Sequence, residues 1–287
     1  MRAGRRSKLT AIDDAVSVVE SGMHLAVGGI WNENTPSALV RALARRGPNN
    51  LKLSAGPASA YPVDLLIGLG LVDTVLAPNV TFEDLGLAPN HRRAIEAGEV
   101  SIVECDEPSL IGGYRAAAAG LPGSIVKSLQ GTSLLDRSPW IEPTTLPSGD
   151  EVLIVPALRP DVTFLHVQQC DEYGNARCLG TIFADRLLAK CAGTVVISAD
   201  EIISNEEVRA DPSRTTIPGF LVDVVVEAPL GAHPCGSHGR YERDTQGLLS
   251  YLAAANAGGD WQGYVDSAVS VSHDEYLQMT DPELHRE

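Results

Sequence analysis

The fold is decided by Met23–Arg46, which reads MHLAVGGIWNENTPSALVRALARR. It opens with a short apolar strand, Met23–Val27, which the pair Gly28-Gly29 interrupts. Pro36 then starts a helix that runs to Arg46, and a proline in the first turn is typical of a helix start. A strand, a tight turn and a helix in this order predict one unit of a layered α/β fold.

The same alternation of strand and helix runs through most of the chain. We expect further helices at Thr10–Val19, Tyr61–Gly68, Phe82–Ala97, Pro108–Ala119, Ile182–Lys190, Thr245–Asn256 and Asp260–Val269, and further strands at Leu51–Ser54, Val72–Leu76, Val100–Cys105, Val152–Ala157, Val162–Val167, Thr194–Ser198 and Leu221–Val226. This pattern favours βαβ units. We therefore predict an open, largely parallel sheet flanked by helices, with ligands bound at the carboxyl ends of the strands.

The stretch near residues 123–150 interrupts this pattern. Its second half is crowded with Pro139, Pro143, Pro147 and Gly149, so we expect irregular structure there, serving as a linker or as a lid. Both flanks share the α/β pattern. We therefore predict one domain over residues 1–287, with residues 123–150 as an excursion from it.

Composition excludes several classes of function. The chain has 287 residues, of which 44% are apolar and 21% charged, as expected of a folded protein. Its 22 Lys and Arg against 37 Asp and Glu give a formal charge of −15. Nucleic acids and anionic membranes attract a positive face, so we expect neither as a partner.

Targeting and metal-binding signals are equally weak. We find no run of the roughly 18–20 apolar residues that a spanning helix needs, and the basic start is followed by acids instead of an apolar segment. Five scattered cysteines without a CxxC pair suit free thiols in a reducing cytoplasm. His233 and His238 are too isolated to indicate a metal, so we predict no metal site.

The glycine turn is the first candidate for binding. Gly28 and Gly29 would let backbone amides approach a ligand, and the helix after them would offer unpaired N–H groups to an anion. The turn fits neither a dinucleotide fingerprint nor a phosphate-binding loop. A plain connection between strand and helix is the alternative interpretation.

The acidic run Glu104-Cys105-Asp106-Glu107 is the second candidate. It ends a predicted strand, where sites form in α/β folds, so Glu107 is a candidate general base or nucleophile. Alternatively, Asp106 or Glu107 caps the following helix. The small polar turns at Ser54 and at Gly131-Thr132-Ser133 are weaker candidates for lining a pocket.

Taken together, several motifs carry a family resemblance. These are Gly28-Gly29 with Pro36 downstream, Arg115–Pro122, Pro156–Asp161, Asp171–Ala176, Arg209–Gly219 and Val222–Pro234. They follow one another in the same order between about residues 10 and 270. The chain resembles the α subunits of family I CoA-transferases, in particular the branch of glutaconate CoA-transferase.

The resemblance implies a fold, a partner and a reaction. It implies an open α/β sheet and a homologous β subunit, usually in an α2β2 assembly. In such transferases a glutamate of the β chain attacks the acyl-CoA thioester, and a glutamyl-CoA thioester then passes CoA to an acceptor carboxylate. Covalent activation of this kind divides one hard exchange into easier steps. Coenzyme A thioesters would be substrates, and no cofactor would be bound permanently.

The resemblance also bears on the candidate residues. The fourth position of the family's glycine loop is often glycine and is here Trp31, which suggests an aromatic wall against an acyl group. Gly131, Thr132 and Ser133 lie where the family lines its acyl pocket. Two related branches, ring-opening hydrolases of steroid breakdown and decarboxylases of glutaconyl-type thioesters, resemble the chain as well. The hydrolases are thought to act through a glutamate of their α chain at the position of Glu107.

Three functions therefore stay open: a CoA-transferase subunit, a hydrolase or decarboxylase subunit in which Glu107 acts directly, and a non-catalytic CoA-binding module. Charge adds one expectation about the partner. A chain at −15 repels the phosphates of CoA, over a range that salt limits to roughly 8–10 Å, so we expect the partner to make most contacts to them.

Overall fold

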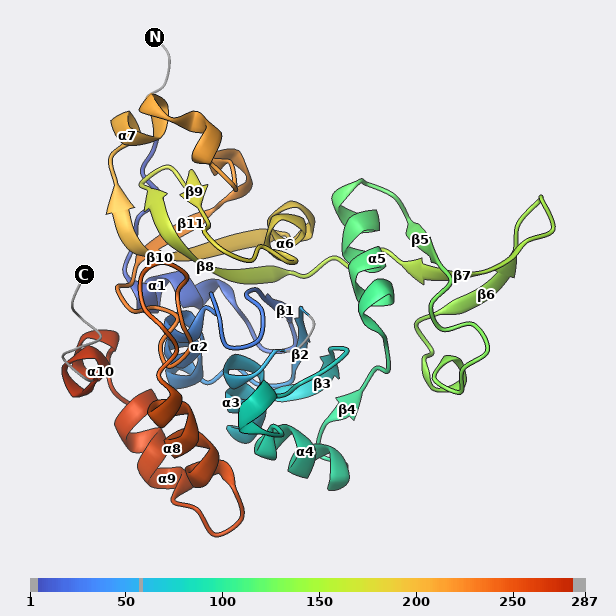
Figure 1. Ribbon diagram of the computed structural model, residues 1–287, viewed down its shortest axis with the longest axis horizontal. Helices are drawn as coiled ribbons and strands as arrows, with labels where there is room; N and C mark the ends of the chain where they lie inside the picture. The colour runs from blue at the N-terminus through green and yellow to red at the C-terminus, as the bar shows by residue number, and fades with distance from the viewer. Residues whose placement is uncertain (1–4, 57–58, 281–287) are drawn as a thin grey trace.

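The computed structural model describes residues 5–56 and 59–280. Among them, an eight-stranded sheet forms the centre of the molecule (Figure 1). Its order is β11 (Val224–Glu227), β10 (Thr194–Ile203), β8 (Val162–Asp171), β1 (His24–Val27), β2 (Leu51–Ala55), β3 (Val72–Leu76) and β4 (Ser101–Ile102). These strands are parallel, and only the short β9 (Ala176–Arg177) pairs antiparallel, with β8. The predicted α/β fold is confirmed.

Helices cover both faces of the sheet, so the central strands are apolar on both sides. One face packs against α1 (Ile12–Ala15), α2 (Ser37–Arg46), α3 (Tyr61–Gly68), α4 (Pro89–Glu96), α8 (Thr245–Ala255) and α9 (Trp261–Tyr264). The opposite face packs against α5 (Glu107–Ala118) and α6 (Asp185–Cys191).

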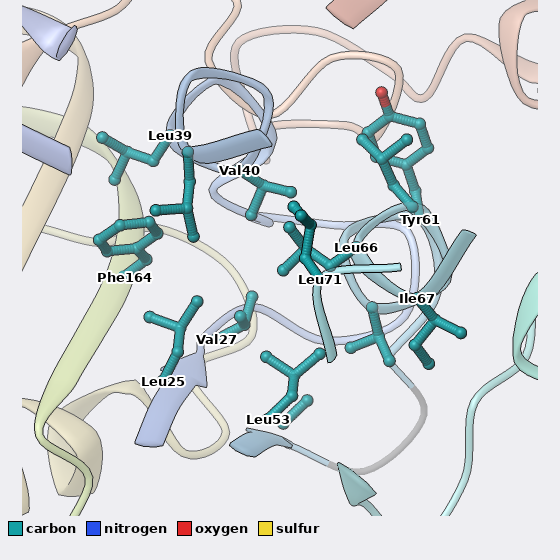
Figure 2. Close-up of a cluster of buried hydrophobic side chains, with 14 of the residues drawn as sticks. Leu25, Val27, Leu39, Val40, Leu53, Tyr61, Leu66, Ile67, Leu71 and Phe164 are labelled. Carbon is teal, nitrogen blue, oxygen red and sulfur yellow. The ribbon is translucent and has the colours of Figure 1, made fainter. Parts of the chain in front are cut away.

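Strand β1 shows how the sequence builds both layers. Leu25 and Val27 point into the first core and Ala26 into the second, as the period of two requires. Figure 2 shows Leu25 and Val27 packed beneath Leu39 of α2, with Phe164 of β8 beside them. The first cluster is the larger, and it fixes α2 directly above the strand whose carboxyl end carries the glycine turn.

The expectation of irregular structure near residues 123–150 is wrong in part. Strands β5 (Gly123–Val126) and β6 (Glu142–Thr145) pair antiparallel with β7 (Glu151–Pro156) in a separate three-stranded sheet, here called the arm. The arm extends beyond α5, away from the main sheet (Figure 1). Strand β7 was predicted, as Val152–Ala157, but β5 and β6 were missed because they are short and because β6 contains Pro143, which only an edge strand tolerates. A role as a lid stays a prediction.

Other boundaries differ for local reasons. The helix expected over Phe82–Ala97 is divided, because Gly86 adopts a φ of 114° and Pro89 starts a new helix. Two short helices were missed, α7 (Asn205–Ala210) and α10 (His273–Met279). Each begins with a capping box, Ser204 with Glu207 and Ser272 with Glu275, a spacing that the sequence does show. Within the described ranges, no helix has the length and apolar character to cross a membrane.

Candidate functional site

The segment directly after Gly28-Gly29 forms one wall of an open hollow at the carboxyl end of β1. The hollow measures about 250 Å³. Ile30–Glu33 line one side, and Gly236–His238 with Tyr241 line the other. Backbone hydrogen bonds join the two walls, from Asn34 N to Gly236 O (2.8 Å) and from Gly236 N to Asn32 O (2.8 Å). The hollow lies at the edge of the sheet where the parallel order predicts ligands.

The amides of the glycine pair are used within the protein. Gly28 donates to the carbonyl of Phe164 at 2.9 Å, and Gly29 donates to Asp185 Oδ1 at 2.9 Å. An N–H group in the first turn of α2 is also used within the protein, because Ala38 N donates to Gly231 O at 2.8 Å. The glycines are needed here for close approach, which favours the tight-turn interpretation. A substrate contact of Gly28 or Gly29 stays a prediction.

Trp31 stands at the tip of this turn. Ile30 and Glu33 exchange two backbone hydrogen bonds of 3.0 and 2.9 Å, which close the turn around it. Its φ of 52° lies in the left-handed region, which a bulky residue seldom adopts, and 46% of its surface is exposed. A strained, exposed tryptophan beside a hollow is suited to pack against a ligand.

The charges around the hollow are mostly paired. His238 Nδ1 lies 3.0 Å from Glu33 Oε1. The guanidinium of Arg243 binds both carboxylate oxygens of Asp84, at 2.8 and 2.7 Å, and Glu83 lies 3.9 Å away. The hollow is therefore polar at its rim, with Trp31 as its large apolar surface.

Beneath the turn lies a carboxyl that the sequence analysis did not single out. Asp185, the first residue of α6, is 3% exposed. Burial raises its pKa to about 6, and the hydrogen bond from Gly29 offsets this rise only in part. No sequence signal pointed to it, because Asp185 and Gly29 are 156 residues apart.

Ser54 lies inside the protein. It is fully buried at the end of β2, where its hydroxyl oxygen is 2.7 Å from His24 Nε2 and accepts a 2.7 Å hydrogen bond from Tyr114. The hydroxyl thus ties α5 to the sheet. Its predicted contact with a ligand would need this network to open, and that prediction stays untested.

Glu107 is the first residue of α5 and is exposed. The capping interpretation is confirmed for its neighbour, because Asp106 Oδ1 accepts a 3.0 Å hydrogen bond from Ser109 N. The carboxylate of Glu107 has no hydrogen bond or salt bridge to any residue of the described ranges. It is therefore available to a ligand or a partner, and its catalytic role stays a prediction.

Gly131, Thr132 and Ser133 belong to the arm. They form an exposed turn after β5 in which Thr132 bonds back to the carbonyl of Leu129, and Gly131 adopts a φ of 75°. Gly131 also borders an arm hollow of about 560 Å³ that includes Thr144 and Thr145 of β6. These three residues thus lie in the loop after β5 of the arm, whereas Trp31 follows β1 of the main sheet.

A second buried network was also missed. His166 Nε2 on β8 lies 3.2 Å from Asp200 Oδ2 on β10, and Tyr241 donates to Asp200 Oδ1 at 3.2 Å. Burial alone would raise the pKa of Asp200, but His166 and the hydroxyl of Ser237 lower it on balance. Since Ser237 and Tyr241 line the hollow, this network holds its second wall in place.

Comparison with known proteins gives the family. A family model described as coenzyme A transferase matches residues 9–228. The chain belongs to this family. The predicted resemblance to α subunits of family I CoA-transferases is confirmed.

Three relatives match nearly the whole chain. An uncharacterized protein of Archaeoglobus fulgidus is 34% identical over 95% of the chain, but the chain spans only 62% of that protein. The A subunit of glutaconate CoA-transferase from Acidaminococcus fermentans is 33% identical, with 94% of this chain and 91% of the relative covered. The cholesterol ring-cleaving hydrolase IpdA subunit of Rhodococcus jostii is 32% identical, with 95% of each covered.

Solved structures agree with these relatives. Glutaconate CoA-transferase from Acidaminococcus fermentans superimposes with a TM-score of 0.92 at 31% identity, covering 97% of this chain and 94% of that one. A variant of the decarboxylase AibA/AibB gives a TM-score of 0.80 at 27% identity, covering 96% and 100%. The CoA-transferase fold thus extends over almost all of the chain.

Proposed function

We propose that the chain is the α subunit of a heteromeric acyl-CoA:carboxylate CoA-transferase of the glutaconate type. The observation that carries the proposal is the TM-score of 0.92 to glutaconate CoA-transferase over 97% of the chain. The position of the hollow supports it, because a site at the carboxyl ends of parallel strands is where this architecture binds ligands.

The proposed reaction needs a homologous β subunit, in an α2β2 assembly. A glutamate of that partner attacks the thioester carbonyl, so that a C–O bond forms, the C–S bond breaks and CoA leaves as thiolate. The thiolate attacks the resulting anhydride at the glutamyl carbonyl and releases the acyl group as a carboxylate. The glutamyl-CoA thioester then transfers CoA to an acceptor carboxylate by the reverse sequence.

The chain's own contribution is to shape the cleft. Trp31 supplies an apolar surface against the acyl group and keeps water from it. The N–H groups of Gly28 and Gly29 are already bonded, so the donors that stabilise the oxyanion come from other groups of the complex. Coenzyme A thioesters are substrates in this scheme, and no cofactor is bound permanently.

The partner also holds most of the CoA phosphates. At −15 the chain repels a polyanion, and Arg243 beside the hollow is already paired with Asp84. The five described cysteines are free thiols, which suits a cytoplasmic enzyme. No nucleic-acid or membrane partner enters the proposal.

A second candidate function uses Glu107 directly. Its carboxylate is exposed and unpaired within the described ranges, as a general base needs to be, and a ring-cleaving hydrolase subunit is 32% identical. In that case the chain is the α subunit of a CoA-thioester hydrolase, or of a decarboxylase such as the one that superimposes with a TM-score of 0.80. A non-catalytic CoA-binding module is the third candidate.

Reconstitution with a homologous β subunit tests the proposal. We expect CoA exchange between an acyl-CoA and a free carboxylate, and an enzyme-bound CoA thioester that hydroxylamine cleaves and borohydride reduces. Hydrolysis or decarboxylation without a trapped thioester would support the second candidate. Tight acyl-CoA binding with no turnover would support the third.

A further inference from the structure

The glycine turn rests on a single buried acid, Asp185. Its Oδ1 accepts the Gly29 N–H at 2.9 Å. Its Oδ2 is also buried and has no hydrogen-bond partner within residues 5–56 and 59–280. A buried carboxyl oxygen without a donor lowers the stability of the folded state, so its presence here needs an explanation.

Two other buried acids of this chain, Asp64 and Asp171, have hydrogen-bond donors on both carboxyl oxygens, as is usual for a carboxyl group that only stabilises the fold. Both oxygens of Asp64 are satisfied, by His91 N at 2.7 Å and by Tyr251 and Asn90 side chains at 2.6 and 3.1 Å. Both oxygens of Asp171 are satisfied by four donors at 2.7 to 3.0 Å. Asp185 has one donor, so the fold gains less from it than from the other two.

The glycine pair is fitted to this acid. A Cβ on Gly28 would lie 2.4 Å from Asp185 Oδ1 and 2.4 Å from Leu165 Cδ2, closer than any side chain allows. Gly29 has a φ of 81°, and its Cβ would lie 2.7 Å from Asn34 O. Both positions therefore require glycine so that the backbone of the turn can come close to the Asp185 carboxyl group.

The hydrogen bond to Asp185 also orients the residues that come after Gly29. Because the peptide group is planar, holding the Gly29 N–H sets the orientation of the whole Gly28-Gly29 peptide. Two residues later the chain reaches Trp31, and the Ile30–Glu33 hydrogen bonds make this segment one compact turn. A change in the orientation of the Gly28-Gly29 peptide would thus shift the position of Trp31 beside the hollow.

We propose that Asp185 is a positioning residue of the hollow, whose carboxylate holds the Gly28-Gly29 peptide and through it sets the position of Trp31. The role in turnover rests on the proposed function, whereas the effect on Trp31 does not. The carboxylate is the stronger acceptor, so gaining a proton there weakens the hold on the turn.

The groups around Asp185 make its protonation separable from other titrations. Leu165 of β8 and Asp185 both lie 2.4 Å from where a Cβ of Gly28 would be, and Cys178 lies near enough for the Asp185 charge to help raise the pKa of that thiol, after burial. The turn itself carries Glu33, bonded to His238. His238 is thus the ionisable side chain beside the hollow that a control variant has to remove.

Tryptophan emission tests the proposal in the full-length chain. Trp140→Phe with Trp261→Phe leaves Trp31 as the sole tryptophan. We expect its emission to change with a midpoint near pH 6. The pH-dependent change in emission should persist when His238→Gln is added and disappear when Asp185→Asn is added. With Asp185→Ala, the emission at every pH should equal the emission that the chain with Asp185 shows at low pH. Each of three results would overturn the proposal: emission that does not depend on pH in the chain with Trp31 as its sole tryptophan, a pH-dependent change that remains with Asp185→Asn, or one that His238→Gln removes.

Turnover by the reconstituted complex gives an independent readout. We expect Asp185→Ala to raise KM for acyl-CoA about tenfold with a smaller change in kcat, and Asp185→Asn, which keeps an acceptor oxygen, to stay within about threefold of wild type. An unchanged KM in Asp185→Ala would contradict positioning. If the wild-type complex turns over no acyl-CoA, the proposed function fails, and the emission measurements still decide the role of Asp185.

Discussion

The hydroxyl of Tyr114 on α5 donates a 2.7 Å hydrogen bond to the hydroxyl oxygen of Ser54 on β2. Both side chains are fully buried, and His24 Nε2 lies 2.7 Å from the same oxygen. The helix that begins at Glu107 is therefore fixed to the sheet by a specific polar contact as well as by apolar packing.

Tyr114→Phe removes this contact and preserves the ring. We expect the free energy of unfolding to fall by about 1 kcal/mol, the usual net value of a buried hydrogen bond. Urea unfolding measures it, and a double-mutant cycle with Ser54→Ala isolates the pair. A coupling energy indistinguishable from zero would show that the contact contributes nothing to stability.

Asp185→Asn should stabilise the chain in a pH-dependent manner. Burial raises the pKa of Asp185 from 3.8 to about 6, so the folded state favours the neutral acid. The contribution of Asp185 to wild-type stability therefore falls as the pH rises from about 4 to 6 and is constant above that range. The Asn variant does not ionise, and its advantage should reach up to about 3 kcal/mol above pH 6 and vanish below pH 4. Unfolding at several pH values measures this difference, and an equal advantage at every pH would contradict it.

Gly28→Ala tests the close packing of the turn. Its Cβ would lie 2.4 Å from both Asp185 Oδ1 and Leu165 Cδ2, so we expect a loss of about 1–3 kcal/mol in unfolding free energy. Gly56→Ala is the matched control, since its Cβ would meet Gly29 O at 3.4 Å and Ala184 at 3.9 Å. Similar losses in both variants would argue against the specific clash.

The main sheet and the helices that flank it could be predicted from the sequence, because the spacing of apolar residues in a strand or a helix is visible within a short segment. Tyr61–Gly68 and Val72–Leu76 were predicted with the bounds that the structure has. The site was predicted only at its edge, at Trp31 and its turn. The roles of Asp185 and of the pair His166 and Asp200 depend on contacts between segments far apart in the sequence. No spacing along the chain predicts such contacts.

Trp31→Ala separates binding from folding. The side chain is 46% exposed, so we expect the unfolding free energy to change by less than about 1 kcal/mol. The loss of its apolar surface should raise KM for acyl-CoA about tenfold in the reconstituted complex. Trp31→Phe should recover part of this loss. An unchanged KM in Trp31→Ala would exclude the tryptophan from the acyl site.

Glu107→Gln distinguishes the two catalytic schemes. If the partner carries the nucleophile, as we propose, turnover should fall less than about tenfold, since removing a general base costs about 10²–10⁴-fold. Asp106→Ala serves as a control for helix α5, because losing its cap to Ser109 should lower stability by about 1 kcal/mol. A loss of a hundredfold or more in Glu107→Gln alone would favour the hydrolase scheme.

The arm packs around its own small set of apolar side chains, Val126, Leu129, Ile141, Leu153 and Val155. Trp140 packs against the second core as well, so changes in the arm that keep Trp140 and the contacts with α5 leave the layers beneath Trp31 and Asp185 intact. The arm can therefore be exchanged as a unit: replacing residues 123–156 by the segment of a relative that keeps Trp140 would vary one part of the protein while the rest keeps its architecture.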